Sequence, residues 1–209
     1  MEKQSNAGNV PLEGGMLCLD FTNTLSWRAS DKRRELLNNF SDLVMWGMHV
    51  GIVEKNCSEN LLKKALRNNA EAEKVHMRAI QLRELLFRIF SSIVKKNPVG
   101  EGELTEFNRY FADTMSRVCC IRTSDEGFLW SFCTRKDALD SMLDPIVKSA
   151  ADLLISPDVK RLKMCNDKDC GWLFVDRSRN NSRRWCNMND CGNRAKARRH
   201  YQRTKKVGK

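Results

Sequence analysis

Apolar side chains return every three or four positions through much of the chain. The longest run lies between residues 70 and 96, where Val75, Leu82, Leu86 and Ile93 mark the repeat. This period places apolar groups on one face of a helix and polar groups on the other. The pattern therefore predicts a long amphipathic helix over residues 70–96.

Shorter stretches with the same period predict further helices. One of them begins at Ser41, a residue type that caps helices, and stops at Gly51. Pro145 interrupts another, so it is expected either to bend that helix or to sit in its first turn. The predicted ranges are 41–51, 58–69, 102–115 and 137–156.

Two short runs rich in Val, Ile, Phe and Trp stand on either side of a polar turn. They cover residues 117–123 and 127–133, with Ser124, Asp125 and Glu126 between them. Adjacent apolar runs joined in this way are typical of a β-hairpin. Residues 1–156 are therefore predicted to be mainly α with a small β-sheet, an α+β fold.

Four of the nine cysteines fall in the last quarter of the chain with a symmetric spacing. Cys165 and Cys170 are separated by four residues, as are Cys186 and Cys191, and fifteen residues lie between the pairs. Two short-spaced pairs at this separation are typical of a tetrahedral zinc site. Four thiolates complete the coordination without water, which indicates one structural Zn²⁺ rather than a catalytic ion.

The other five cysteines are scattered through apolar surroundings. A disulfide framework usually belongs to smaller, secreted chains, so these thiols are interpreted as small core residues. They are Cys18, Cys57, Cys119, Cys120 and Cys133.

The net charge of +11 is confined to the C-terminal quarter. Residues 1–156 carry 21 Lys and Arg and 21 Asp and Glu, whereas residues 157–209 carry 16 and 5. The balance changes where Ser156 and Pro157 interrupt a helical pattern. This predicts two parts, residues 1–156 and residues 157–209, and the excess charge of the second part favours a polyanionic partner.

After Cys191 the chain is predicted to form a strongly basic helix. A narrow stripe of Ala197, His200, Tyr201 and Thr204 is expected to dock on the protein, and the rest of the surface carries seven Lys and Arg. Because no acidic residue follows Asp190, these cations repel one another and an external anion array such as a phosphate backbone stabilises the helix. A solubilising tail is the alternative.

Arginine dominates the first half of this helix, which favours bidentate contacts to phosphate or guanine edges. Arg194 lies beside the predicted metal, so a structural role and a contact role are both open for it. The candidate nucleic-acid-binding residues are Arg183, Arg184, Arg194, Lys196, Arg198, Arg199 and Arg203.

The segment between the two cysteine pairs reads as two strand-like runs around a polar turn at residues 178–182. Trp172, Phe174 and Trp185 are expected to cover the metal with apolar surface, because a module this small has too little core of its own. Stacking of the tryptophans on nucleic-acid bases is the alternative.

Near the N-terminus, polar groups stand inside the apolar stretch "LCLDFTNTL". Buried Asp20, Asn23 and Thr24 need hydrogen-bond partners, since an unpaired polar atom costs about 1–3 kcal/mol. The partner is either the chain itself, through a helix cap or an ion pair with Arg83, or a small ligand. These four residues are the candidate ligand site.

The C-terminal segment resembles the CGNR zinc-finger family of bacterial proteins, through "CGWLFVDRSRNNSRRWC" and "CGNRAKARRHYQR". The naming motif stands at residues 191–194. "LCLDFTNTL" and "LRELLF" are similar, less specifically, to the ABATE domain that accompanies this finger in stress-induced transcriptional regulators. The resemblance implies a treble clef in which a knuckle supplies Cys165 and Cys170 and a helix supplies Cys191 in its first turn, with Cys186 just before it. It also implies DNA binding and an unidentified ligand for the N-terminal part.

These features together predict a cytoplasmic, DNA-binding transcriptional regulator that is not an enzyme. No P-loop, G-x-S-x-G, H-E-x-x-H or dinucleotide motif is present in the sequence. Neither a secretory signal nor a run of roughly 18 apolar residues is present, so no membrane partner is expected. An RNA-binding module and a zinc-thiolate redox switch or protein-interaction module are the alternatives, and a homodimer is left open.

Overall fold

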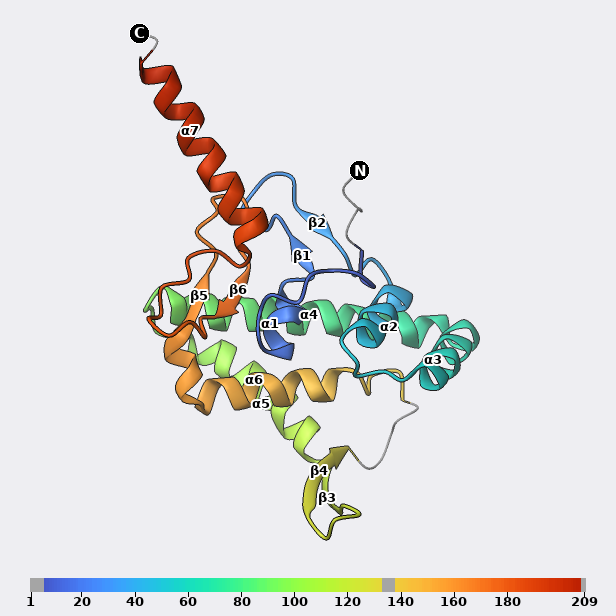
Figure 1. Cartoon of the computed structure of the whole chain (residues 1–209). Helices are drawn as coiled ribbons and strands as arrows, with labels where there is room; N and C mark the ends of the chain where they lie inside the picture. The colour runs from blue at the N-terminus through green and yellow to red at the C-terminus, as the bar shows by residue number, and fades with distance from the viewer. Residues whose placement is uncertain (1–5, 133–137, 208–209) are drawn as a thin grey trace.

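The computed structural model describes residues 6–132 and 138–207, which form a mainly helical body with small antiparallel sheets (Figure 1). The predicted fold class is confirmed. Within the described residues, no helix is both long and apolar enough to cross a bilayer. The helices are α1 (Leu17–Thr22), α2 (Phe40–His49), α3 (Lys55–Arg67), α4 (Asn69–Val94), α5 (Glu101–Met115), α6 (Leu143–Ile155) and α7 (Asn193–Val207). The strands are β1 (Leu25–Ser26), β2 (Arg34–Glu35), β3 (Val118–Arg122), β4 (Phe128–Phe132), β5 (Leu162–Met164) and β6 (Leu173–Val175).

Helix α4 runs through the body, and α1, α2, α3 and α5 pack against it (Figure 1). Its predicted apolar face is buried, because Val75, Leu82 and Leu86 are at most 5% exposed. Asn68 caps its first turn by accepting a hydrogen bond from the backbone N–H of Glu71. The long helix predicted over residues 70–96 is therefore confirmed, and it supplies much of the core.

The ends of three predicted helices differ in detail. Helix α2 is capped by Asn39, two residues earlier than the expected Ser41, and Gly51 follows its end with a φ of +79°. Helix α3 begins at Lys55 rather than at residue 58. Helix α6 begins only at Leu143, and Pro145 lies in its first turn, where its missing N–H would have had no helical acceptor. Residue 137, the predicted start of that helix, lies outside the described residues.

The predicted hairpin is present, with Val118 opposite Phe132 and Arg122 opposite Phe128. It does not bury all of its cysteines. Cys119 is half-buried and disulfide-bonded, and Cys120 is exposed, so the expectation of core thiols is wrong there. The reason is that the hairpin projects from the body as an isolated pair of strands (Figure 1). Of the other scattered cysteines, Cys18 is buried, Cys57 is half-buried and Cys133 lies outside the described residues.

The C-terminal strands share the main hydrophobic core. Leu162, Leu173 and Val175 lie in the same buried cluster as the residues of α1 and α4. The side chain of Asn23 bonds both backbone groups of Leu173, its Nδ2 donating to the carbonyl and its Oδ1 accepting from the N–H, each at 2.9 Å. The Val175 N–H donates to the Gly14 carbonyl at 2.9 Å. Gly14 and Asn23, which stand on either side of α1, thus tie the short β5–β6 sheet to the helical body.

Asn23→Ala tests this tie. The substitution leaves the buried N–H and carbonyl of Leu173 without partners, so we expect the free energy of unfolding to fall by about 2–4 kcal/mol. Urea unfolding of the zinc-loaded protein measures the change. The control is Asn60→Ala, because Asn60 is exposed on α3 and its loss should change stability by less than about 0.5 kcal/mol. Equal effects of the two substitutions would contradict the role assigned to Asn23.

Candidate metal centre and nucleic-acid interface

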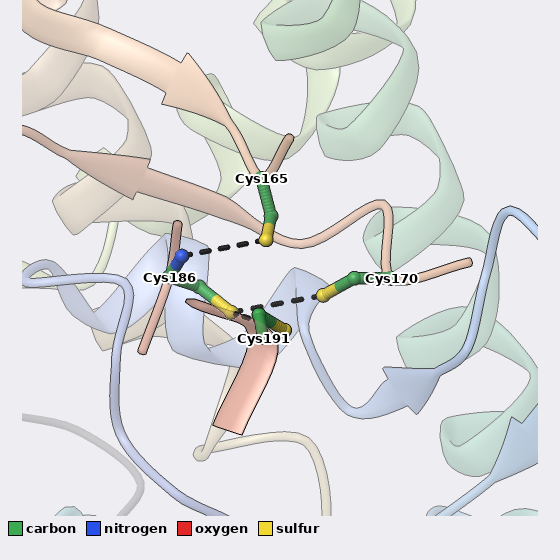
Figure 2. Close-up of side chains that lie close together, drawn as sticks. All are labelled: Cys165, Cys170, Cys186 and Cys191. Atoms are coloured by element: carbon green, nitrogen blue, oxygen red, sulfur yellow. Dashed lines mark hydrogen bonds between the residues drawn. The ribbon is translucent and has the colours of Figure 1, made fainter. Parts of the chain in front are cut away.

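Four cysteine side chains from separate segments converge on one point (Figure 2). Cys165 follows β5, Cys170 precedes β6, and Cys186 lies in the loop after β6. Cys191 lies in a π-helical turn, Met188–Gly192, that leads into α7. All four side chains are buried, and their sulfur atoms lie within 4.8 Å of one another. The symmetric spacing in the sequence therefore becomes a single cluster.

The cluster has the chemistry and size of a zinc site. Cys186 Sγ lies 3.7 Å from Cys170 Sγ and 3.5 Å from Cys191 Sγ. Four sulfurs at about 2.3 Å from a central Zn²⁺ would stand about 3.8 Å apart at tetrahedral geometry, which these distances match. The backbone N–H of Cys186 donates to Cys165 Sγ at 3.4 Å, a contact that suits a thiolate. The four cysteines are the ligands of one structural Zn²⁺.

Aromatic side chains cover the metal site as predicted. Phe174 is fully buried against the four cysteines, and Trp172 and Trp185 pack on the same cluster while remaining half-buried. Their apolar surface separates the sulfurs from water, which strengthens the attraction between thiolates and cation. Packing around the metal is the role that the structure assigns to these rings.

The elements around the site differ from the expected treble clef in two details. The knuckle is the turn between β5 and β6, and no strand forms over residues 183–186. There the backbone makes other bonds, because the Arg183 N–H donates to Asp176 Oδ2 at 2.8 Å and the Arg184 carbonyl accepts from the Asn166 N–H at 2.9 Å. Cys191 also precedes α7 instead of lying within its first turn.

Asp176 organises this loop although it is completely buried. Burial alone would raise the pKa of its carboxyl. The ammonium of Lys163 at 2.6 Å and hydrogen bonds from Ser178 and from the Arg183 backbone outweigh that effect and hold the pKa well below its ordinary value. Asp176 is thus an ionised structural residue, and the sequence pattern did not single it out.

Arg194, the arginine of the CGNR motif, is part of the metal centre. Its Nη2 donates to Cys191 Sγ at 2.9 Å and its Nε donates to Asp167 Oδ2 at 3.0 Å. The guanidinium also lies over the ring of Trp27, 4.4 Å from its centroid. Donation to a ligand sulfur offsets part of the negative charge of a four-thiolate site. The structural role left open for Arg194 is the one that these contacts support.

Arg198, one turn later on α7, faces the same carboxylate. Its Nη2 donates to Asp167 Oδ1 at 2.6 Å and its Nη1 donates to Asp169 Oδ2 at 3.3 Å. Asp167 is 2% exposed, and burial would raise its pKa, but Arg198 and Arg194 lower it below its ordinary value. Two arginines on one face of α7 therefore hold the helix to the knuckle.

Arg183 is also engaged within the protein. Its guanidinium lies over the Phe174 ring, 4.4 Å from the centroid, and donates to Glu13 Oε2 at 3.0 Å. The Asn187 side chain donates to the other oxygen of Glu13 at 2.6 Å. Arg183 therefore links the loop of the metal site to the N-terminal segment.

The remaining candidate cations face solvent. Lys196, Arg199 and Arg203 are exposed at positions i, i+3 and i+7 of α7, on the side of the helix away from Asp167. Arg184 is exposed beside the Trp185 ring. Among the described residues, none of these four has a carboxylate partner.

A basic groove of about 430 Å³ lies between the knuckle and α7. Lys168 belongs to this groove, and sequence reasoning missed it because Asp167 and Asp169 flank it and mask its charge. The other lining residues are Asn166, Arg184, Trp185, Ala195, Arg198, Arg199 and Gln202.

The predicted docking stripe on α7 is wrong. Ala197, His200, Tyr201 and Thr204 are all exposed, and Tyr201 retains 60% of its accessible surface. Figure 1 shows the reason, because α7 extends away from the body beyond its first turns. Contacts of Arg194 and Arg198, rather than an apolar stripe, anchor the helix.

The knuckle rests on the loop after β1. The Arg28 N–H donates to the Cys170 carbonyl at 3.1 Å, and the Arg28 guanidinium pairs with Glu84 of α4 at 2.5 Å. Gly171 has a φ of +72°, and a Cβ at this position would lie 3.2 Å from the Cβ of Arg28. Glycine suits the position for both reasons, since other residues adopt this backbone at a cost and would crowd the loop.

The four candidate ligand residues all have partners within the chain. Asp20 Oδ1 accepts from the Gly14 N–H at 2.8 Å, and burial raises the pKa of its carboxyl to about 6. The Thr24 hydroxyl donates to the Phe21 carbonyl at 2.7 Å and lies 3.3 Å from Arg83 Nη1. Asn23 bonds Leu173, as described above.

The fourth residue, Arg83, is 2% exposed and forms ion pairs with Glu35 and Glu84 at 2.5 and 3.0 Å rather than with Asp20. A cavity of about 190 Å³ lies elsewhere, and Cys57, Leu61, Arg117 and Asp144 are among its lining residues. None of the four predicted residues lines it.

Two family models match the chain. Residues 15–157 match the ABATE model, described as "Putative stress-induced transcription regulator", and residues 161–204 match the CGNR zinc finger. A search of curated proteins finds no match. The matched ranges meet where α6 ends and a short 3₁₀ turn, Pro157–Arg161, begins.

Metal content tests the cluster directly. Elemental analysis of the purified protein should find about one zinc per chain, and Cys186→Ser should lower that content and destabilise the C-terminal segment. Cys120→Ser is the matched control, because Cys120 is exposed on the hairpin and should keep the full content. A folded protein with far less than about one zinc per chain would refute the structural site.

Gly171→Ala tests the contact between knuckle and body. We expect a loss of about 2–3 kcal/mol in the free energy of unfolding, from the left-handed backbone and from the contact with Arg28. Gly15→Ala separates the cost of the left-handed backbone from the cost of the contact with Arg28. Gly15 also has a positive φ, +76°, but its added Cβ would meet nothing within 4 Å. That control should lose only about 1 kcal/mol. Equal losses in chemical denaturation would show that the crowding is absent.

Proposed function

Since the chain belongs to the ABATE family of transcription regulators and carries a CGNR zinc finger, we propose that it binds duplex DNA through α7 and the adjoining basic groove. The zinc ion has a structural part in this proposal. It holds the start of α7 in place, while the protein's own side chains contact the phosphates.

One observation carries the proposal, namely the two-sided arrangement of cations on α7. Arg194 and Arg198 face the knuckle, where both pair with Asp167, Arg194 also pairs with Asp190, and Arg198 also pairs with Asp169. Lys196, Arg199 and Arg203 are exposed on the side away from Asp167, over a length of roughly 10 Å at 1.5 Å per residue. No acidic residue occurs after Asp190, so an external polyanion is the charge that suits this face.

The shape of α7 also supports duplex DNA as the partner. The helix extends from the body with its side chains exposed from Arg199 to Lys205 (Figure 1). The B-DNA major groove is about 12 Å wide and admits one α-helix. Lys168 and Arg184 line the groove at the base of the helix, where a phosphate backbone flanking the inserted helix would pass.

Other readings of the sequence remain predictions. A basic helix on a zinc knuckle also suits structured RNA. For the redox alternative, Cys186 Sγ lies 3.7 Å from Cys170 Sγ and 3.5 Å from Cys191 Sγ, so oxidation of either pair to a disulfide would need only a small movement. A small ligand for the N-terminal part, a cytoplasmic location and the absence of enzymatic activity also stay predictions.

Salt dependence of DNA binding tests the proposal. If Lys168, Arg184, Lys196, Arg199 and Arg203 neutralise about five phosphates, the log-log slope of affinity against salt should be about −4 to −5. Replacing Lys196, Arg199 and Arg203 together by Ala should reduce the slope by about 2 to 3. Fluorescence anisotropy with a labelled duplex at several salt concentrations gives both values.

The control is Lys63→Ala with Arg109→Ala, since both residues are exposed cations on α3 and α5. It should leave the slope unchanged. No binding, or binding that does not respond to salt, would overturn the proposal. Stronger competition by structured RNA than by duplex DNA at equal phosphate concentration would favour the RNA alternative.

A further inference from the structure

The β3–β4 hairpin lies at the end of the molecule opposite α7 (Figure 1), and it exposes large aromatic side chains. Phe128 and Trp130 retain 69% and 66% of their accessible surface. Leu129 and its cross-strand partner Ile121 retain 45% and 37% but point to the opposite face of the hairpin. Scattered exposed apolar residues are ordinary on a soluble protein, but two large exposed aromatic side chains side by side, as at Phe128 and Trp130, mark an interaction surface.

The register of the hairpin places the most exposed residues on one face. Cys120 lies opposite Trp130, and Arg122 lies opposite Phe128. Side chains of directly opposed residues point to the same face of a sheet. We call the face formed by Cys120, Arg122, Phe128 and Trp130 the hairpin face.

Little of the described protein covers this face. The two strands contact mainly each other, and within the described residues no third strand joins them. An isolated two-stranded hairpin is marginally stable in water, and further strands or a packed face are needed to stabilise it. The hairpin therefore has both an apolar face and open strand edges for a partner.

We propose that a second copy of the chain packs on the hairpin face and forms a homodimer centred on Phe128 and Trp130. Tryptophan is among the side chains that contribute most at protein interfaces, and aromatic residues are enriched there. A two-fold interface brings the same patch of both copies together, so the patch must tolerate its own charges. This hairpin meets that condition.

The charges of the hairpin suit a second copy. Strand β4 has no charged residue, so two such strands meet without repulsion. The turn end of the hairpin carries charges of both signs, namely Arg122 at the end of β3 and Asp125 and Glu126 in the turn. Among the described residues, neither Arg122 nor Glu126 forms an ion pair. The two acidic residues of the turn disfavour an anionic membrane or a nucleic acid as the partner.

The hairpin offers a small interface, because each strand has only five residues. Stable complexes usually bury about 800 Å² per partner, so we expect a reversible dimer with a dissociation constant in the micromolar range. The dimer is independent of the proposed DNA contacts, because the hairpin and α7 lie at opposite ends of the molecule (Figure 1).

Sedimentation velocity of the full chain from about 1 to about 200 µM tests the proposal. The protein should shift from monomer to dimer over this range. Phe128→Ser with Trp130→Ser should weaken the dimer at least about tenfold while zinc content and thermal unfolding stay unchanged, since both side chains are largely exposed. The control is Leu66→Ser with Ile155→Ser, because these residues are 85% and 87% exposed elsewhere. It should leave the dimer intact.

Crosslinking checks the geometry. Facing sheets lie about 10 Å apart, so a bismaleimide of similar reach should join the two exposed Cys120 thiols of a dimer. The covalent dimer should disappear in Cys120→Ser, in which Cys57 remains. A monomer at every concentration would overturn the proposal, as would a dimer that survives the hairpin substitutions or a crosslink that survives Cys120→Ser. Binding to vesicles of anionic lipid without dimerisation would overturn it as well.

Discussion

Four thiolates around one cation hold the C-terminal quarter of the protein in shape. Strands β5 and β6 have only three residues each, and the loop that follows them contains no strand. Ionised sulfurs within 4.8 Å of one another repel unless a cation lies between them. The coordinated metal therefore joins the knuckle, the loop and the turn before α7, which local hydrogen bonds alone would leave loosely connected.

Arginine contacts extend this centre to the helix that leaves it. Arg194 bridges the ligand Cys191 and the buried carboxylate of Asp167, and Arg198 occupies the second oxygen of Asp167. Charge-assisted hydrogen bonds to a buried carboxylate are strong, and they also fix the direction from which the two arginines approach it. The direction of α7 thus follows from the metal through Asp167, and the cations on its other side face away from the body.

The metal centre is also continuous with the N-terminal part. Asn23 pairs with Leu173 as a strand would, Arg28 supports Cys170, and Glu13 receives Arg183. These contacts come from the segment that precedes and follows α1. A rearrangement of this segment would therefore act on the base of α7 through hydrogen bonds rather than through a flexible linker.

Sequence reasoning succeeded where a pattern has a single physical meaning. The helical period around Leu82 predicted α4, because apolar residues that recur every three or four positions lie on one face of a helix, and burial of that face stabilises it. It failed for Tyr201 and Cys120, which look like docking or core residues by type but are exposed. Residue type does not determine burial when the element that carries the residue projects from the body.

The sequence by itself determined the metal ligands, the main helices and the location of the excess positive charge, because local spacing and composition decide each of these. Only the tertiary structure decided which cations are free. Arg183, Arg194 and Arg198 resemble Lys196, Arg199 and Arg203 in sequence, yet the first three meet Glu13 and Asp167 across the fold. The physical reason is that neutralisation of a charge depends on distance in space, and the partners of these arginines are brought near by folding rather than by spacing along the chain.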